Sequence, residues 1–85
     1  MELHQLRYFV AVAETGSFTR AAEREGVTQP TLSEQVMRLE GKAHGVGRRL
    51  FDRLGRKVVL TDAGRELLGR AQGILAAVGE AERAV

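Results

Sequence analysis

Residues 18–40, FTRAAEREGVTQPTLSEQVMRLE, have the pattern of two helices joined by a sharp turn. In the first part, Phe18, Ala21 and Ala22 are spaced for one face of a short helix. Gly26 follows, and a glycine can take the positive φ that a tight turn between helices requires. This pattern is typical of a helix-turn-helix, whose second helix enters the major groove of DNA by its N-terminal end.

The second helix is expected over residues 29–40. Thr28 precedes it, and a threonine hydroxyl at this position can accept from a free N–H of the first turn. Pro30 falls in that turn, where the missing N–H has no cost. Apolar residues at i, i+4 and i+7 form one stripe: Leu32, Val36 and Leu39. The polar side chains lie on the remaining faces: Gln29, Thr31, Ser33, Glu34 and Arg38.

The preceding residues predict a first helix over 3–15, because its apolar residues share one face: Leu3, Leu6, Phe9, Val10 and Ala13. Ser17 is placed to cap the next helix, expected over 18–24, whose free N–H groups would hold a DNA phosphate with the help of Arg20. A capped helix without a ligand would show the same residues. Glu25 stands where a side chain usually packs inward, so either it reaches the surface or the turn is looser than most.

Residues 41–47, GKAHGVG, predict a loop, because three of the seven are glycines, and we expect His44 to be solvent-exposed. Two short strands are predicted next, at 50–53 and 57–60, with residues 54–56 as the turn. A basic hairpin after a helix-turn-helix is typical of the wing of winged-helix domains. Its cations would lie along a phosphate strand or in the minor groove: Arg53, Arg56 and Lys57. The alternative is a hairpin that only completes the fold.

From Thr61 onward the sequence predicts one long helix, with Thr61 as its cap and Asp62 at the positive end of its dipole. Apolar and small residues recur at spacings of three and four, which is the heptad pattern of paired helices: Gly64, Leu67, Ala71, Ile74, Val78, Ala81 and Val85. Leu68 and Leu75 widen the stripe. Because a lone helix of this kind is marginal, we expect it to pair with a second copy, its N-terminal half also touching the domain.

The composition of the 85 residues indicates one small domain, with 44% hydrophobic residues and a net charge of only +2. The absence of cysteine excludes disulfides and thiolate metal sites, and two histidines cannot complete a zinc site, so we expect no metal and no cofactor. No apolar run resembles a signal peptide or a membrane span, which favours a cytoplasmic protein without membrane contact. Cations cluster in one stretch, as expected for a surface that meets DNA phosphates or, alternatively, only solvent: Arg38, Lys42, Arg48, Arg49, Arg53, Arg56 and Lys57.

Nearly the whole chain resembles the N-terminal DNA-binding region of LysR-type transcriptional regulators. The segments that carry the resemblance are LHQLRYFVAVAETGSFTRAAE, VTQPTLSEQVMRLE and LFDRLGRKVVLTDAG. The resemblance implies a mainly α, winged helix-turn-helix with a two-stranded wing over residues 1–60, its helix-turn-helix over 18–40 and its wing over 50–60. It also implies a linker helix over 61–85 that pairs antiparallel with its partner's, and a C-terminal domain, outside these residues, that binds a small-molecule effector.

The resemblance also implies roles for individual residues. The family's residues that face the groove or its phosphates match Gln29, Pro30, Thr31, Ser33 and Glu34. Its wing residues that meet the DNA backbone or minor groove match Arg53 and Arg56. The chain departs from the family at Glu34, where a basic residue is common; a carboxylate cannot bind phosphate, but it can accept from a cytosine amino group. The stretch 41–45 is three residues longer than in the family, which affects the loop before the wing.

We therefore predict sequence-specific binding of double-stranded DNA by a homodimer. The full-length protein could also form a higher oligomer. The operator would be an inverted repeat with half-sites one helical turn, or a multiple, apart. Gln29 is the expected reader of adenine, and Thr31 would touch a thymine methyl, whereas Ser33 and Arg38 would hold phosphates. The alternative is a protein-interaction module that uses the long helix for docking. An enzyme is a third possibility, which no nucleophile–base–acid set supports.

Overall fold

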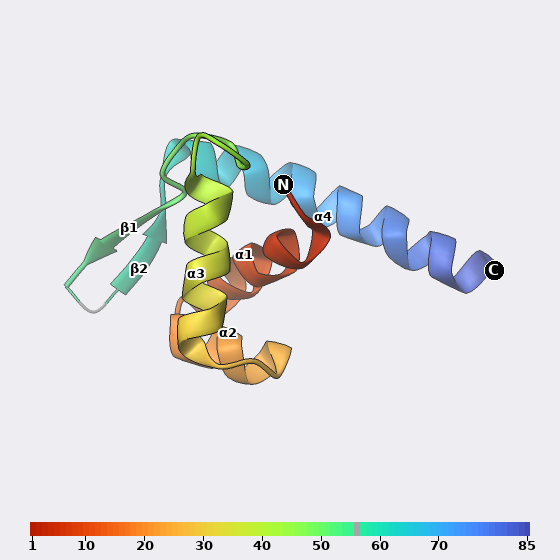
Figure 1. Cartoon of the computed structure of the whole chain (residues 1–85), viewed down its shortest axis with the longest axis horizontal. Helices are drawn as coiled ribbons and strands as arrows, with labels where there is room; N and C mark the ends of the chain where they lie inside the picture. Colours follow the sequence, from red (N-terminus) through yellow and green to blue (C-terminus); the bar gives the residue numbers. More distant parts are fainter. Residues whose placement is uncertain (56) are drawn as a thin grey trace.

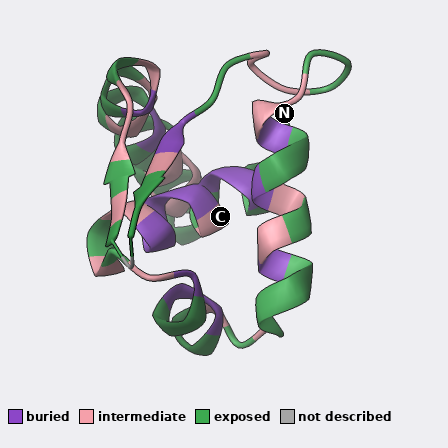
Figure 2. Ribbon diagram, turned by 90° about the vertical axis from the view of Figure 1, so that its left-hand side faces the viewer, coloured by how far each residue is buried: buried purple, intermediate pink, exposed green. Residues whose placement is uncertain are grey.

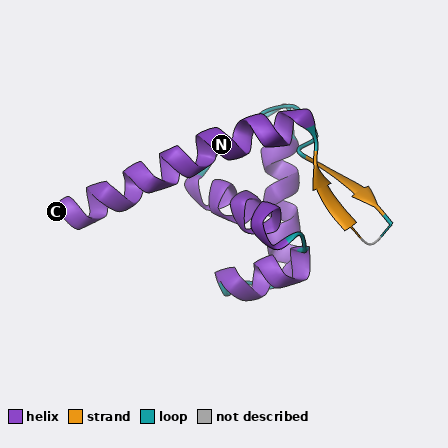
Figure 3. Ribbon diagram, turned by 180° about the vertical axis from the view of Figure 1, so that it is seen from behind, coloured by secondary structure: helices purple, strands orange, loops and turns teal. Residues whose placement is uncertain are grey.

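The computed structural model describes residues 1–55 and 57–85 as a mainly helical chain with one two-stranded sheet (Figures 1 and 3). The elements follow in the order α1 (Leu3–Thr15), α2 (Phe18–Glu25), α3 (Gln29–Glu40), β1 (Phe51–Leu54), β2 (Lys57–Leu60) and α4 (Asp62–Ala84). This order confirms the predicted winged helix-turn-helix followed by a long helix. The wing and the C-terminal half of α4 project from opposite sides of the helical body (Figure 1).

The core lies where α1, α2 and α3 meet, and α1 is its centre (Figure 2). The predicted face of α1 is only partly correct, because Leu3 is exposed while Ala11 and Val12 are fully buried. The reason is that α1 packs against α2, α3 and α4 at once, so it is covered on more than one side. The stripe of α3 is buried as predicted: Leu32, Val36 and Leu39.

The turn between α2 and α3 has the expected geometry. Gly26 has φ 71°, in the left-handed region that favours glycine, and its N–H donates to the carbonyl of Ala22. Thr28 Oγ1 accepts from the backbone N–H of Thr31, so the predicted cap of α3 is confirmed. The side chain of Glu25 is partly exposed, and its Oε2 lies 3.6 Å from Nε of Arg24. Of the two alternatives for Glu25, the side chain therefore reaches the surface.

The long loop after α3 folds back over the helix end. The N–H of Val46 donates to the carbonyl of Leu39 at 2.8 Å, and the N–H of Gly45 donates to that of Gly41 at 3.1 Å. A Cβ at Gly45 would collide with the carbonyl oxygen of Leu39. Residues 41–47 therefore form a compact turn, and His44 within it is exposed as predicted.

A carboxylate joins the end of α3 to the start of the wing. Glu40 Oε2 accepts from the N–H of Leu50 at 2.8 Å. The antiparallel strands pair Phe51 with Leu60 and Leu54 with Lys57. The predicted first strand was therefore one residue too early, since Leu54 belongs to the ladder and Leu50 is buried before it.

The long helix α4 begins as predicted, with Thr61 Oγ1 accepting from the N–H of Gly64 at 3.0 Å. A side chain at Gly64 would collide with the carbonyl of Leu50, so glycine permits the close packing of α4 on the segment before β1. The N-terminal half of α4 packs against α1, and Ala71 on this face is 0% exposed. The C-terminal half extends beyond the body (Figure 1).

Candidate nucleic-acid interface

The outer face of α3 is a polar surface opposite the buried stripe. Five of the predicted contact residues lie on it. Four are exposed and Ser33 is half-buried: Gln29, Pro30, Thr31, Glu34 and Ser33. Figure 2 shows α3 with its buried residues toward the body and its exposed ones outward. No part of the described chain covers this face, so it is open to solvent. The major groove of DNA is wide enough to admit an α-helix such as α3.

Two hydrogen bonds link side chains one turn apart on this face. Gln29 Nε2 donates to Ser33 Oγ at 2.7 Å, and Arg38 Nη2 donates to Glu34 Oε1 at 3.0 Å. Because both hydrogen bonds are exposed to water, replacing either of them with a hydrogen bond to another partner has a small net cost in free energy. Gln29 and Arg38 therefore keep their donors available, and the charge of Arg38 is partly offset by Glu34.

A surface hollow of about 270 Å³ lies between the wing, the start of α2 and the start of α3. It is lined by Gly16, Ser17, Phe18, Thr19, Gln29, Arg53, Gly55, Lys57 and Val58. The fold thus brings together four predicted contact residues from three separate segments: Ser17, Gln29, Arg53 and Lys57. An amide side chain and two cations share one concave surface.

The wing is anchored by aromatic contacts. The Phe51 ring lies 5.3 Å from that of Phe9 and 5.9 Å from that of Phe18, which seats β1 on the core. The guanidinium carbon of Arg53 lies 4.4 Å from the centre of the Phe18 ring, within the range of a cation–π contact. This contact was not predicted, because Phe18 was assigned to the core alone and nothing in the sequence links it to Arg53.

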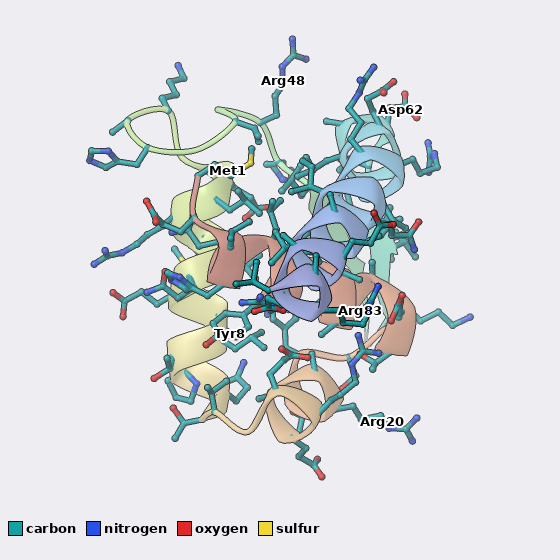
Figure 4. All side chains as sticks on the ribbon, turned by 90° about the vertical axis from the view of Figure 1, so that its right-hand side faces the viewer. Met1, Tyr8, Arg20, Arg48, Asp62 and Arg83 are labelled. Carbon is teal, nitrogen blue, oxygen red and sulfur yellow. The ribbon has the colours of Figure 1, made fainter. Side chains whose placement is uncertain are left out.

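The other predicted cations that the structure describes lie outside this hollow. Arg20 extends away from the ribbon (Figure 4), while its backbone N–H donates to the Ser17 hydroxyl at 3.1 Å, as expected for the cap of α2. Arg48 also points outward, from the loop after α3 (Figure 4). Arg49 is paired with Asp52, which reduces its contribution to a basic surface. Arg56 was also predicted to contact DNA, but it lies outside the described residues.

The apolar stripe of α4 is divided between two environments. Ala71, predicted for the dimer contact, has no exposed surface and serves the chain's own core instead, because α4 packs on α1 at this point. Ile74 is 41% exposed, and the neighbouring stripe residues are half-buried or exposed: Leu67, Leu68, Leu75, Val78 and Ala81. Leu67, Leu68 and Leu75 pack partly against the chain's own core, so the apolar strip that lies open beyond the body consists of Ile74, Val78 and Ala81.

In residues 1–55 and 57–85, no three or more histidine and acidic side chains come together as a metal site would need. Within the same ranges, every helix is too short or too polar to pass through a bilayer.

The chain matches the family model of the bacterial regulatory helix-turn-helix proteins of the lysR family over residues 3–65. An uncharacterised HTH-type transcriptional regulator of Azotobacter vinelandii is 51% identical to this chain. The match covers the whole of this chain and 57% of that protein. The HTH-type transcriptional regulator TfdT of Cupriavidus pinatubonensis is 46% identical. That match covers 98% of this chain and 35% of TfdT. The chain thus spans between about a third and just over half of these two relatives.

Solved structures show the same arrangement. The DNA-binding domain of BenM, crystallised with benA site 1 DNA, superposes with a TM-score of 0.89 at 39% identity, covering 99% of this chain and 91% of that one. The DNA-binding domain of CbnR, in a DNA complex, gives a TM-score of 0.88 at 39% identity, covering 99% of this chain and 93% of that one. Both of these neighbours were crystallised on DNA.

Proposed function

The chain belongs to the lysR family of bacterial regulatory helix-turn-helix proteins, and we propose that it binds double-stranded DNA sequence-specifically as a homodimer. The observation that carries this proposal is the hollow shared by Gln29 of α3, Ser17 at the start of α2, and Arg53 and Lys57 of the wing. An amide that can select a base and cations that can hold phosphates lie on one surface, which is what recognition of a duplex requires. Two structural neighbours were crystallised in complex with DNA, which supports a DNA-binding role for this fold.

In this proposal α3 enters the major groove by its N-terminal end. Gln29 exchanges its hydrogen bond with Ser33 for a bidentate pair with adenine, and Ser33 is freed for a phosphate. Thr31 touches a thymine methyl, and Glu34 accepts from a cytosine amino group. Arg38 binds a phosphate when it leaves Glu34.

The remaining cations fix the position of the protein on the duplex. Ser17 and Arg20 hold a phosphate at the start of α2, where free N–H groups and the positive end of the helix dipole favour an anion. The wing follows the adjacent minor groove or phosphate strand with Arg53, Lys57 and Arg56. These contacts carry affinity and its salt dependence, but not sequence preference.

Two copies would pair through the exposed strip on α4. Ile74 is exposed and Val78 half-buried in the C-terminal half of α4. This half extends beyond the body (Figure 1), where a second α4 can approach without displacing the core. With the two recognition helices held at a fixed separation, the operator is an inverted repeat. A small-molecule effector would act through a further domain of the kind that longer members of the family carry.

The experiment is selection of duplexes from a random pool, followed by titration of the winner at rising salt. We expect an inverted repeat, and a loss of affinity of roughly 10³–10⁵ between 50 and 200 mM salt if six to ten phosphates are neutralised. A protein-interaction module would select no sequence and would show little salt dependence, and that result would end the proposal.

A further inference from the structure

Met37 lies on the outer face of α3, one turn beyond Ser33. Pro30, Ser33, Glu34 and Met37 are spaced at i, i+3, i+4 and i+7, so they occupy one face of the helix. A homeodomain recognition helix contacts the major groove with residues at this same spacing. The first three are among the proposed contact residues, and Met37 completes the set.

The exposure of Met37 has no structural purpose within the chain. Its side chain is 69% exposed, more than any other large apolar side chain in residues 1–55 and 57–84. The buried stripe of α3 lies on the other side of the helix, and the remaining residues of the outer face are polar or proline. An apolar side chain therefore stands alone in the middle of a surface that is otherwise suited to DNA.

The chemistry of methionine restricts what it can contact there. It has no charge and no donor, so it cannot hold a phosphate. Its neighbour Glu34, which pairs with Arg38, has no donor for a phosphate either, so this part of the face suits the base edges better than the DNA backbone. The apolar group that a base pair presents in the major groove is the C5-methyl of thymine. A thioether on three rotatable bonds can adapt to reach it.

Resting on the DNA-binding function proposed above, we propose that Met37 is a specificity-determining residue that recognises a thymine through its C5-methyl group. The contact is distinct from the one assigned to Thr31, because Met37 lies further along α3 and so meets a different base pair. The wild-type protein is then sensitive to the thymine methyl at two positions of each half-site.

The test replaces each thymine of one half-site of the selected operator with deoxyuridine, one at a time, and measures Kd for the wild type, Met37→Ala and Met37→Leu. Burial of one methyl group is worth about 0.8 kcal/mol, so we expect the wild type to lose about fourfold at the Met37 position. Met37→Ala should bind thymine and uracil equally at that position alone, and Met37→Leu should keep the preference. Thr31→Ser, which removes only a methyl group, should abolish the sensitivity at the other position.

The outcomes separate this proposal from the function on which it rests. If the wild type selects an operator but Met37→Ala keeps every thymine-to-uracil ratio, the role of Met37 is overturned and DNA recognition stands. If the wild type binds all duplexes alike, both are overturned. Because Met37 is exposed, the variants should melt at the wild-type temperature, and circular dichroism checks this before the titrations.

Discussion

The guanidinium of Arg53 lies 4.4 Å from the centre of the Phe18 ring, and this contact joins the wing to the first helix of the helix-turn-helix. Phe18 follows the cap residue of α2 and also packs on Phe51. One aromatic ring therefore supports both the strand and its cation. The side chain proposed to hold the DNA backbone is already oriented before DNA arrives, which reduces the entropy lost on binding.

We expect Arg53→Ala to weaken binding to all sequences and to reduce the slope of log K against log salt by about one. Phe18→Leu keeps an apolar side chain in the core but removes the ring, so it should produce a smaller loss of the same kind. In the double variant the loss should equal that of Arg53→Ala, because the ring acts only through the arginine. Fully additive losses in a fluorescence titration would contradict this coupling.

The ion pair of Glu34 and Arg38 predicts an unusual effect of removing a charge. Glu34→Gln keeps the size of the side chain but frees Arg38, so affinity for random DNA should rise and the salt slope should steepen by about one. If Glu34 also recognises cytosine, the preference at one C·G pair should fall in the same variant.

A matched control exists on α4, where Glu66 and Arg70 form the same i,i+4 pair at 2.9 Å, away from the proposed interface. Glu66→Gln changes the net charge equally but should leave the salt slope close to that of the wild type. Equal effects of the two substitutions would show that net charge alone is responsible and that Arg38 binds no phosphate.

The loop after α3 makes a prediction about stability. Gly45→Ala should lower the free energy of unfolding by about 1–3 kcal/mol, because the new Cβ would meet the backbone carbonyl of Leu39. Gly69→Ala is the control, since nothing lies within 4 Å of a Cβ at that helical position, and it should raise stability by about 0.5–1 kcal/mol. Urea unfolding followed by circular dichroism measures both. Equal effects of the two substitutions would exclude the close approach at Gly45.

Much of the fold could be predicted because local signals and burial agree. Thr28 and Pro30 define the start of α3, Gly26 defines the turn, and the spacing of Leu32 and Val36 gives the buried side. Each of these depends on neighbours within a turn or two of helix, so the amino-acid sequence contains the whole signal.

What escaped prediction depends on contacts between distant segments. The second buried face of α1, with Ala11 and Val12, exists because α1 packs against α2, α3 and α4 at once. Ala71 was assigned to a partner chain for the same reason, since a heptad pattern does not say which surface will cover it. The support of Arg53 by Phe18 likewise depends on tertiary packing, which no local pattern encodes. The turn around Gly45 closes on Leu39, only six residues away, and escaped prediction because three glycines indicate a loop without giving its conformation.

The exposed strip of α4 predicts how the chain assembles. Ile74→Glu places a charge on the strip and should shift sedimentation equilibrium from dimer toward monomer, with a parallel loss of affinity for the full inverted repeat but not for a half-site. Ala76→Glu adds the same charge on the opposite side of α4 and should leave the dimer intact. A monomeric wild type, or equal effects of both substitutions, would exclude α4 as the dimer contact.

The most direct test of the account is the affinity of Gln29→Ala for the selected operator and for a random duplex of the same length. The amide of Gln29 is exposed at the start of α3, within the hollow that it shares with the wing. We predict a loss of roughly 1–3 kcal/mol on the operator, with the adenine preference relaxed at one position, and little change on random DNA. Gln72→Ala, at an exposed glutamine of α4, should change neither. An equal loss on both duplexes would mean that Gln29 selects no base, and α3 would then not be the element that recognises the sequence.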